Sequence, residues 1–289
     1  MRPETRASAA VLLSRTYRPA ADLAPYVRRF YVFEAELPPG LVIEDFLLSE
    51  TAFVRVLIRG DWAAQVAPQQ WSSPGKSLFF GANSRPFRVR VNGSFCVAGA
   101  ALRPSGWRAL FHASHHDYAD RLLRLDEVWP VRSSELEAAV DRAEDDAGKI
   151  AAMEAVLRDQ LDRIGNWRID EQLARFETIA RTDSTRRVED IADELSLSMR
   201  HFARRCQVGF GLSPKAVLRR SRFLDMAAAM RGFSSPTEQD LAALRYYDQS
   251  HLVREFRQFA GMTPNVFAHA VTPLQTAGLK LREESKYED

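Results

Sequence analysis

An internal duplication in the last third of the chain is the feature that most constrains its fold. The segment His-Phe-Ala-Arg at 201–204 returns as His-Leu-Val-Arg at 251–254, an offset of 50 residues (251 minus 201). Gly-Leu-Ser-Pro at 211–214 likewise returns as Gly-Met-Thr-Pro at 261–264. Two copies indicate a duplicated supersecondary unit rather than a solenoid, which is built from more repeats.

Each copy has the pattern of a helix, a tight turn and a second helix. In the first copy Ser198 is placed to cap the second helix, and Phe202 and Cys206 face inward, four residues apart. In the second copy Asp248 takes the capping position and Phe256 an inward position. The pattern therefore predicts two helix-turn-helix motifs.

The exposed faces of the two second helices carry side chains suited to DNA. Such a helix enters the major groove, where arginine bonds bidentately to guanine. We predict base contacts from the residues on these faces, namely Arg200, Arg204, Gln207, Gln249, Ser250 and Arg254. We predict contacts to the DNA backbone from nearby polar and basic residues, namely Ser198, Arg205, Lys215, Arg219, Arg220, Arg222, His251 and Arg257. The helix at about 214–231 would hold both motifs against successive groove segments of one site.

Charge is distributed unevenly along the chain, whose net charge is +2. Residues 184–270 hold 13 Lys/Arg against 9 Asp/Glu, hence +4, and the rest of the chain holds 27 against 29, hence −2. A cationic C-terminal part agrees with a polyanionic partner such as nucleic acid, although many surfaces of this charge have no such partner.

The segment from about Val188 to Phe267 resembles the DNA-binding domain of the AraC/XylS family of transcription regulators. The resemblance rests on Tyr-Asp-Gln-Ser-His-Leu-Val-Arg-Glu-Phe-Arg at 247–257 and on Gly-Met-Thr-Pro at 261–264. More weakly, residues 18–28, 85–87 and 102–106 resemble the sensor region of one AraC subgroup.

The resemblance implies a bacterial one-component regulator with a cupin-like N-terminal domain that senses an effector, dimerises, or does both. It implies double-stranded DNA as the partner and leaves a small-molecule effector, RNA polymerase and a second copy of the chain as further partners. The chain departs from the family pattern in both turns and at one core position: Ser196 and Arg245-Tyr246 occupy turns that usually contain glycine, and Cys206 replaces a larger apolar residue. If the second turn abolishes DNA binding, the chain would act through protein contacts instead.

The N-terminal part has the pattern of a β domain followed by helices. Short apolar runs separated by turn residues predict many short strands, and Phe-Arg-Val-Arg-Val at 87–91 alternates strictly. Such strands suit a small barrel or jelly roll. Further on, Ser134 and Glu137 form a capping box, and residues 150–164 carry one continuous apolar stripe. Either the chain's own β domain or a second copy would cover this stripe.

We therefore predict an α+β fold, with an N-terminal cupin-like β domain with flanking helices and then an all-α domain with two helix-turn-helix motifs. The expected segments are a flexible lead-in at 1–16, a β-rich sensor-like domain at 17–125, a helical linker or dimerisation region at 126–181, the double helix-turn-helix domain at 182–270 and a polar tail at 271–289.

Composition narrows the remaining function classes. The chain is 46% hydrophobic and 27% charged, and no apolar stretch approaches the ~20 residues of a membrane span, so we expect a cytoplasmic protein without a membrane partner. Its only cysteines, Cys96 and Cys206, exclude a disulfide framework and a multi-cysteine zinc site. The alternative of a cupin-type metal enzyme with a helical appendage needs histidines on the strands, and residues 17–102 contain none. The histidines at 112–116 lack a third ligand, so no metal, cofactor or enzymatic activity is predicted.

Overall fold

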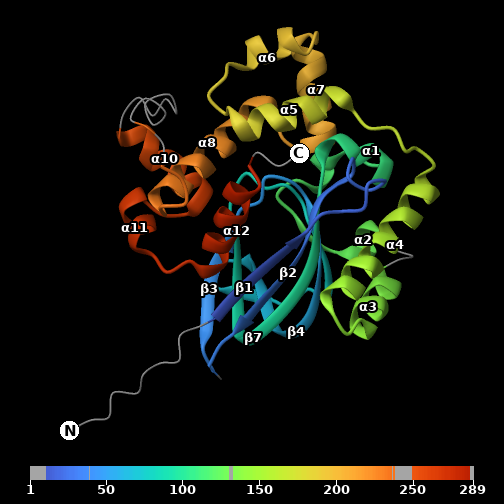
Figure 1. The fold of residues 1–289 in the computed structure, drawn as a ribbon. Coiled ribbons are helices and arrows are strands. Elements are labelled where there is room, and N and C mark those ends of the chain that lie inside the picture. The colour runs from blue at the N-terminus through green and yellow to red at the C-terminus, as the bar shows by residue number, and fades with distance from the viewer. Residues whose placement is uncertain (1–10, 39, 130–132, 236, 238–248, 287–289) are drawn as a thin grey trace.

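The structure, a computed structural model, describes residues 11–38, 40–129, 133–235, 237 and 249–286. Its N-terminal part is a curved antiparallel sheet flanked by helices, and its C-terminal part is helical (Figure 1). This arrangement confirms the predicted α+β fold class. Within the described ranges, no helix combines the length and apolar character needed to cross a membrane.

The sheet is built around two long strands, β4 and β7, which pair with each other. Its strand order is β1-β2-β7-β4-β6-β8, with β3 added to β7 and β5 to β4. The strands are β1 (Val11–Tyr17), β2 (Val27–Glu36), β3 (Val42–Leu47), β4 (Phe53–Ala67), β5 (Gln70–Ser72), β6 (Ser77–Phe80), β7 (Phe87–Leu102) and β8 (Leu122–Arg124).

The two faces of the sheet pack against different parts of the chain. Along β4, Val54 and Val56 belong to a core that the sheet shares with the first helices. Phe53 and Leu57 alternate with them and border a second core on the opposite face, together with buried Trp62 and Phe80. Successive side chains of a strand point to opposite faces, and here both faces are covered. This segment is therefore almost continuously apolar.

Four helices cover the first face of the sheet: α1 (Trp107–Leu110), α2 (Leu125–Val128), α3 (Ser133–Arg142) and α4 (Asp146–Ile164). The apolar stripe of α4 lies in this core, with Ile150, Met153, Leu157 and Leu161 all buried. The chain's own β domain therefore covers the stripe, and the alternative in which it forms a dimer seam is not supported.

The remaining helices form the C-terminal part, in two packed groups: α5 (Glu171–Thr182), α6 (Val188–Glu194), α7 (Met199–Phe210), α8 (Pro214–Met230), α10 (Gln249–Ala260), α11 (Pro264–His269) and α12 (Pro273–Glu284). One apolar cluster joins α5, α6, α7 and the start of α8 around Phe176 and Phe202. A second joins the end of α8 to α10, α11 and α12 around Phe223 and Phe256, and includes Phe46 of β3. The long helix α8 thus belongs to both groups, as expected for a rigid connector.

Three expected segments need correction. Residues 11–16 are not a flexible lead-in, because β1 pairs with β2 from Val11↔Glu36 to Tyr17↔Phe30. Residues 271–289 are not simply a polar tail, because residues 273–284 form α12, which buries Leu274 and Leu279 against β3 and α8. The linker at 126–181 is divided, because α5 packs into the helix-turn-helix core rather than with α3 and α4.

Candidate DNA-binding surface and interdomain cavity

The helix α7 has the geometry of a recognition helix. Ser198 begins it, and its hydroxyl accepts a hydrogen bond from the backbone N–H of His201 at 3.3 Å. Phe202 and Cys206 are fully buried, as the sequence pattern predicts. The thiol pKa of Cys206 is raised by burial, so this cysteine is a core residue rather than a reactive one.

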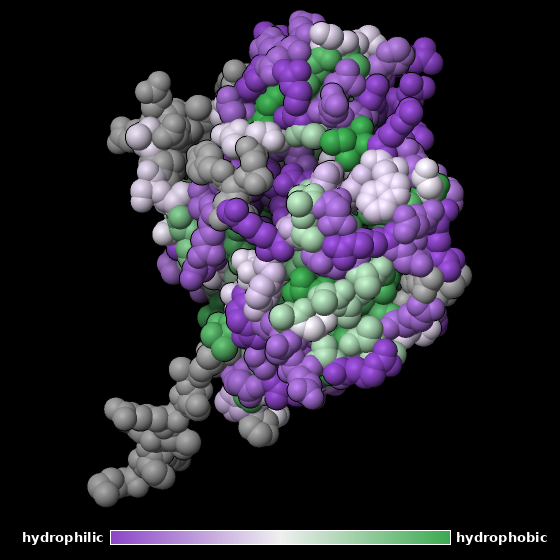
Figure 2. Space-filling model, turned by 45° about the vertical axis from the view of Figure 1, so that its right-hand side comes forward, coloured by the Kyte–Doolittle hydropathy of each residue, from purple (hydrophilic) through white to green (hydrophobic). Residues whose placement is uncertain are grey.

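The opposite face of α7 is free to meet a partner. Arg200, Arg204 and Gln207 are all exposed on it. Among the described residues, no carboxylate lies within ion-pair distance of Arg200 or Arg204. The surface is mostly hydrophilic at the top of the molecule, the level of α6 and α7 (Figure 2). Two adjacent cations without internal partners suit a polyanion.

The turn before α7 takes a conformation that usually requires glycine. Ser196 has a φ of 55°, in the left-handed region, and its N–H bonds to the carbonyl of Asp193 at 2.9 Å. The first turn therefore adopts the left-handed conformation although it has no glycine. The second turn, with Arg245-Tyr246 and the capping Asp248, lies outside the described residues.

The helix α10 matches α7 in its burial pattern. Phe256 and Phe259 are buried, and Ser250, Arg254 and Arg257 are exposed. Gln249 begins the helix, but its side chain lies outside what is described. The structure thus brings Ser250 and Arg254 onto one accessible face, as it does Arg200, Arg204 and Gln207 on α7.

Some of the residues predicted to contact the DNA backbone are exposed, and others bond to groups within the protein. Lys215 is exposed. Arg219 of α8 pairs with Glu255 of α10 and donates to Gln258 at 2.9 Å, so it joins the two helices. Other internal contacts join Arg205 to Asp170, Arg222 to the carbonyl of Ser184 at 3.1 Å, and His251 to Glu255 at 3.7 Å.

Arg220 corrects one of these predictions. Its side chain is 1% exposed, and its guanidinium donates to the backbone carbonyls of Asn83, at 3.1 Å, and Glu50. Both acceptors belong to the β domain, so Arg220 joins the two domains and is not available to a phosphate. The sequence places it beside the half-buried Arg219 on a basic helix, and helical spacing alone could not show that the β domain covers it.

A buried ionic network continues this junction. The guanidinium of Arg282 on α12 bonds to Glu50 through Nε and to Asp225 of α8 through Nη1, both at 2.8 Å. Burial alone would raise the pKa of Glu50, but the charges of Arg282, Arg28 and Arg181 and the hydrogen bond from Arg282 together outweigh it and lower the pKa to about 2. Glu50 is therefore ionised at neutral pH, and the network fixes α12 to both domains.

His115 forms a second bridge between the domains. Its ring stacks on Trp107 with centroids 4.0 Å apart, its Nε2 accepts from the N–H of Ala82 at 3.0 Å, and its Nδ1 donates to the carbonyl of Gly209 on α7 at 2.8 Å. Burial lowers its pKa to about 4. Both ring nitrogens are occupied by backbone groups, and the described residues contain no cluster of three or more metal-ligating side chains.

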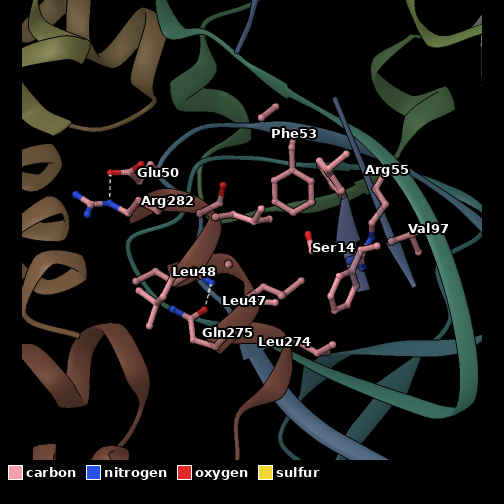
Figure 3. A pocket seen from close by; sticks show the side chains of 18 of the residues that line it. Ser14, Leu47, Leu48, Glu50, Phe53, Arg55, Val97, Leu274, Gln275 and Arg282 are labelled. Atoms are coloured by element: carbon pink, nitrogen blue, oxygen red, sulfur yellow. Dashed lines mark hydrogen bonds and ion pairs between the residues drawn. The ribbon is translucent and has the colours of Figure 1, made fainter. Parts of the chain in front are cut away.

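A cavity of about 170 Å³ lies between the second face of the sheet and α12. Strands β1 to β4 and β7 supply one wall, and Leu274, Gln275 and Arg282 of α12 contribute to the other (Figure 3). Gln275 accepts a hydrogen bond from the N–H of Leu48 at 3.3 Å, which ties α12 to the rim of the sheet. None of the site residues predicted from the sequence lines this cavity. The position of Arg55 could nonetheless be inferred from the strand alternation. Because Val54 and Val56 face one core, Arg55 lies with Phe53 on the other face of β4, where a charged side chain is unusual.

Two family models match the chain. Residues 191–270 match a helix-turn-helix domain, and residues 15–124 match a domain of unknown function, DUF6597. The first match, which covers both motifs, confirms the resemblance to the AraC/XylS family of transcription regulators. No curated protein matches the sequence.

Solved structures with a similar arrangement include two of ToxT from Vibrio cholerae. One is 11% identical, with a TM-score of 0.46, and the match covers 89% of this chain and 97% of that one. Another, with a bound unsaturated fatty acid, is 11% identical, with a TM-score of 0.43 and coverage of 95% and 99%. The AraC-like transcriptional activator CuxR is 12% identical, with a TM-score of 0.27 and coverage of 74% and 86%. Likenesses this distant define neither a ligand nor a target for this chain.

Proposed function

We propose that this protein is a sequence-specific DNA-binding transcription regulator in which α7 and α10 read successive major-groove segments of one site. The observation that carries the proposal is the paired exposure of Arg204 and Arg254 at equivalent positions of two duplicated helices whose opposite faces are buried. The match of residues 191–270 to a helix-turn-helix domain supports it.

The rigid connection between the two helices supports reading of a single long site. Arg219 bonds from α8 to Glu255 and Gln258 of α10, and Val217 and Leu218 at the start of α8 pack with Phe202 of α7. Held in this way, α7 and α10 would present Arg204 and Arg254 to groove segments about one turn (~34 Å) apart. Control by an effector, dimerisation, contact with RNA polymerase and a cytoplasmic location belong to the same proposal.

Binding-site selection with two variants tests this function. Losing a bidentate base contact costs about 1–3 kcal/mol and relaxes the preference at the contacted base pair. Arg204→Ala should therefore relax one end of the selected site, and Arg254→Ala the other end. The control is Lys215→Ala, an exposed cation at the start of α8 that we expect to weaken all sequences alike.

Three outcomes would count against the proposal in different ways. If both arginine variants lose affinity uniformly and keep every base preference, neither arginine reads sequence. If the wild-type chain binds DNA with an affinity that does not fall as salt rises, the phosphate contacts are absent. If the wild-type chain selects no DNA at all, the chain acts through protein contacts instead.

A further inference from the structure

The cavity under α12 has apolar walls with one unusual cation inside. Phe33, Phe53, Val97 and Leu274 are among the side chains that line it. Its volume of about 170 Å³ is close to that of an engineered cavity of ~150 Å³ that holds benzene. A second hollow shares Ser14, Phe33, Ala277 and Leu281 with it and continues between β1 and α12. The space therefore accepts a small ring or a short acyl chain.

Arg55 reaches into this space from β4, on the side opposite Arg282 and Glu50 (Figure 3). Its guanidinium carbon lies 4.5 Å from the ring centroid of Trp62 and 4.7 Å from that of Phe80. Among the described residues, no carboxylate, carbonyl or hydroxyl accepts a hydrogen bond from this guanidinium, and its Nε is buried without an acceptor. The ring faces stabilise the positive charge but leave its N–H donors unsatisfied.

The other charged groups that line the cavity already bond to groups of the chain. These pairs are Arg28 with Glu177, Arg29 with Ser285, and Glu50 with Arg282. Arg55 is therefore the cation, among the charged side chains described around this space, that makes no hydrogen bond or ion pair. Burial lowers its pKa, which reflects the cost of holding the charge there without an anion.

Four further polar atoms of lining residues are buried without a hydrogen-bond partner, and two of them, Nη1 of Arg28 and Nη2 of Arg282, belong to guanidinium groups that are already ion-paired. The hydroxyl of Ser14 on β1 and the indole Nε1 of Trp62 on β4 are both buried and unbonded. Gly99 of β7 pairs with Tyr31 on one side and with Arg55 on the other, and a Cβ at this position would collide with the Tyr31 ring. The absence of a side chain at 99 thus makes room for the Tyr31 ring. Buried donors without acceptors in a native structure call for an explanation, and a bound acceptor supplies one.

We propose that this cavity binds a small carboxylic acid, with the carboxylate held by Arg55 and an aromatic or short aliphatic body against the apolar wall under α12. A planar carboxylate matches the two parallel N–H groups of a guanidinium, and one monoanion neutralises one cation. A phosphate ester would bring a second charge, whereas the other lining cations, Arg28, Arg29 and Arg282, already bond to groups of the chain. The regulatory role of this ligand rests on the function proposed above, but its binding does not.

Calorimetric titration of the full chain without DNA tests the assignment. The probes are benzoate and hexanoate, each with its neutral amide, benzamide and hexanamide, as a match in size. Because a hydrogen bond to a charged group is worth roughly ten- to hundredfold in affinity, each acid should bind at least about tenfold more tightly than its amide. Arg55→Gln should remove this preference and leave amide binding unchanged.

The control variant is Arg88→Gln, which removes the same charge from an exposed position of the neighbouring strand β7. It should keep the acid preference of the wild type. The assignment is overturned if neither acid binds the wild type, if acid and amide bind the wild type equally, or if a folded Arg55→Gln variant keeps the preference. The wild-type comparison of acid with amide decides the matter even if Arg55→Gln does not fold. Since DNA is absent, failure of the DNA-binding proposal would leave these results intact.

Discussion

His115 illustrates how one side chain can report on contact between the two domains. The ring is neutral because the Ala82 N–H needs a lone pair on Nε2 while Nδ1 donates to Gly209. A charged ring would have to donate from both nitrogens and would leave the Ala82 N–H without an acceptor. Burial and the nearby charge of Arg220 both lower its pKa, to about 4.

This arrangement predicts a pH-dependent contribution to stability. The ordinary pKa of histidine is about 6.5, so below this pH the imidazole of residue 115 is protonated in the unfolded chain. In the folded protein it stays neutral down to about pH 4. The free energy of unfolding should therefore fall by about 3 kcal/mol as pH drops from 6.5 to 4. Urea unfolding of the wild type and of His115→Gln at several pH values measures it. The difference in free energy of unfolding between the wild type and the variant should decrease by about that amount between pH 6.5 and pH 4. The contributions of the other titrating groups are the same in both proteins and cancel in this difference.

Glutamine is the informative replacement because its amide can accept from Ala82 and donate to Gly209 without titrating. The control is His112→Gln, which removes an exposed imidazole from the same segment. If the difference between wild type and His115→Gln is constant from pH 7 to 4, then His115 does not stay neutral in the folded protein.

At the scale of single elements, α12 depends on an acid from a different domain. The helix begins at Pro273, and its Ncap residue Thr272 makes no side-chain cap. Asp45 of β3 supplies the cap instead, with Oδ2 accepting from the N–H groups of Leu274 at 2.7 Å and Gln275 at 3.3 Å. Burial raises the pKa of Asp45 to about 6, against the three backbone donors that oppose the rise.

Removing this cap should loosen α12 specifically. Asp45→Ala leaves two N-terminal N–H groups buried without an acceptor, so the free energy of unfolding should fall by about 1–2 kcal/mol. Hydrogen exchange followed by mass spectrometry should show faster exchange over residues 273–284. Glu44→Ala is the matched control, because Glu44 is exposed and its ion pair with Arg90 is worth less than about 1 kcal/mol. Equal exchange over 273–284 in both variants would mean that Asp45 does not hold the helix.

The same helix shows where sequence reasoning ends. The duplicated motifs were predictable because their period, caps and inward residues are local, and Phe202, Cys206 and Phe256 are buried as expected. In α12 the local pattern is short, and its stability comes from Asp45, Gln275 and Arg282 bonding to groups more than 200 residues away or on another helix. Contacts of that range leave no periodic trace in the sequence.

On the scale of the whole molecule, the two domains meet through ionic and backbone contacts as well as apolar ones. Arg220 and Arg282 both end at Glu50, one on its carbonyl and the other on its carboxylate. The loop that carries Glu50 also lines the cavity, and α12 closes the cavity while packing on α8. A ligand that shifts α12 would therefore act directly on the helix that connects α7 to α10. This continuity is the physical route by which occupation of the cavity could alter DNA binding.

Arg220 is the residue through which this coupling is best tested. Arg220→Met keeps most of the side-chain volume and removes both hydrogen bonds, leaving the carbonyls of Asn83 and Glu50 buried without donors at about 1–3 kcal/mol each. Because both carbonyls belong to the β domain, the loss weakens the contact between domains more than either core. We expect the domains to unfold at separate urea concentrations, measured by hydrogen exchange over 27–36 of β2 and 214–230 of α8.

The control is Arg219→Met, one position along the helix. It breaks the contacts to Glu255 and Gln258 inside the C-terminal domain and should leave the two domains coupled as in the wild type. A single coincident transition in Arg220→Met, as cooperative as that of the wild type, would show that Arg220 is a local packing residue and that the domains are joined by other contacts.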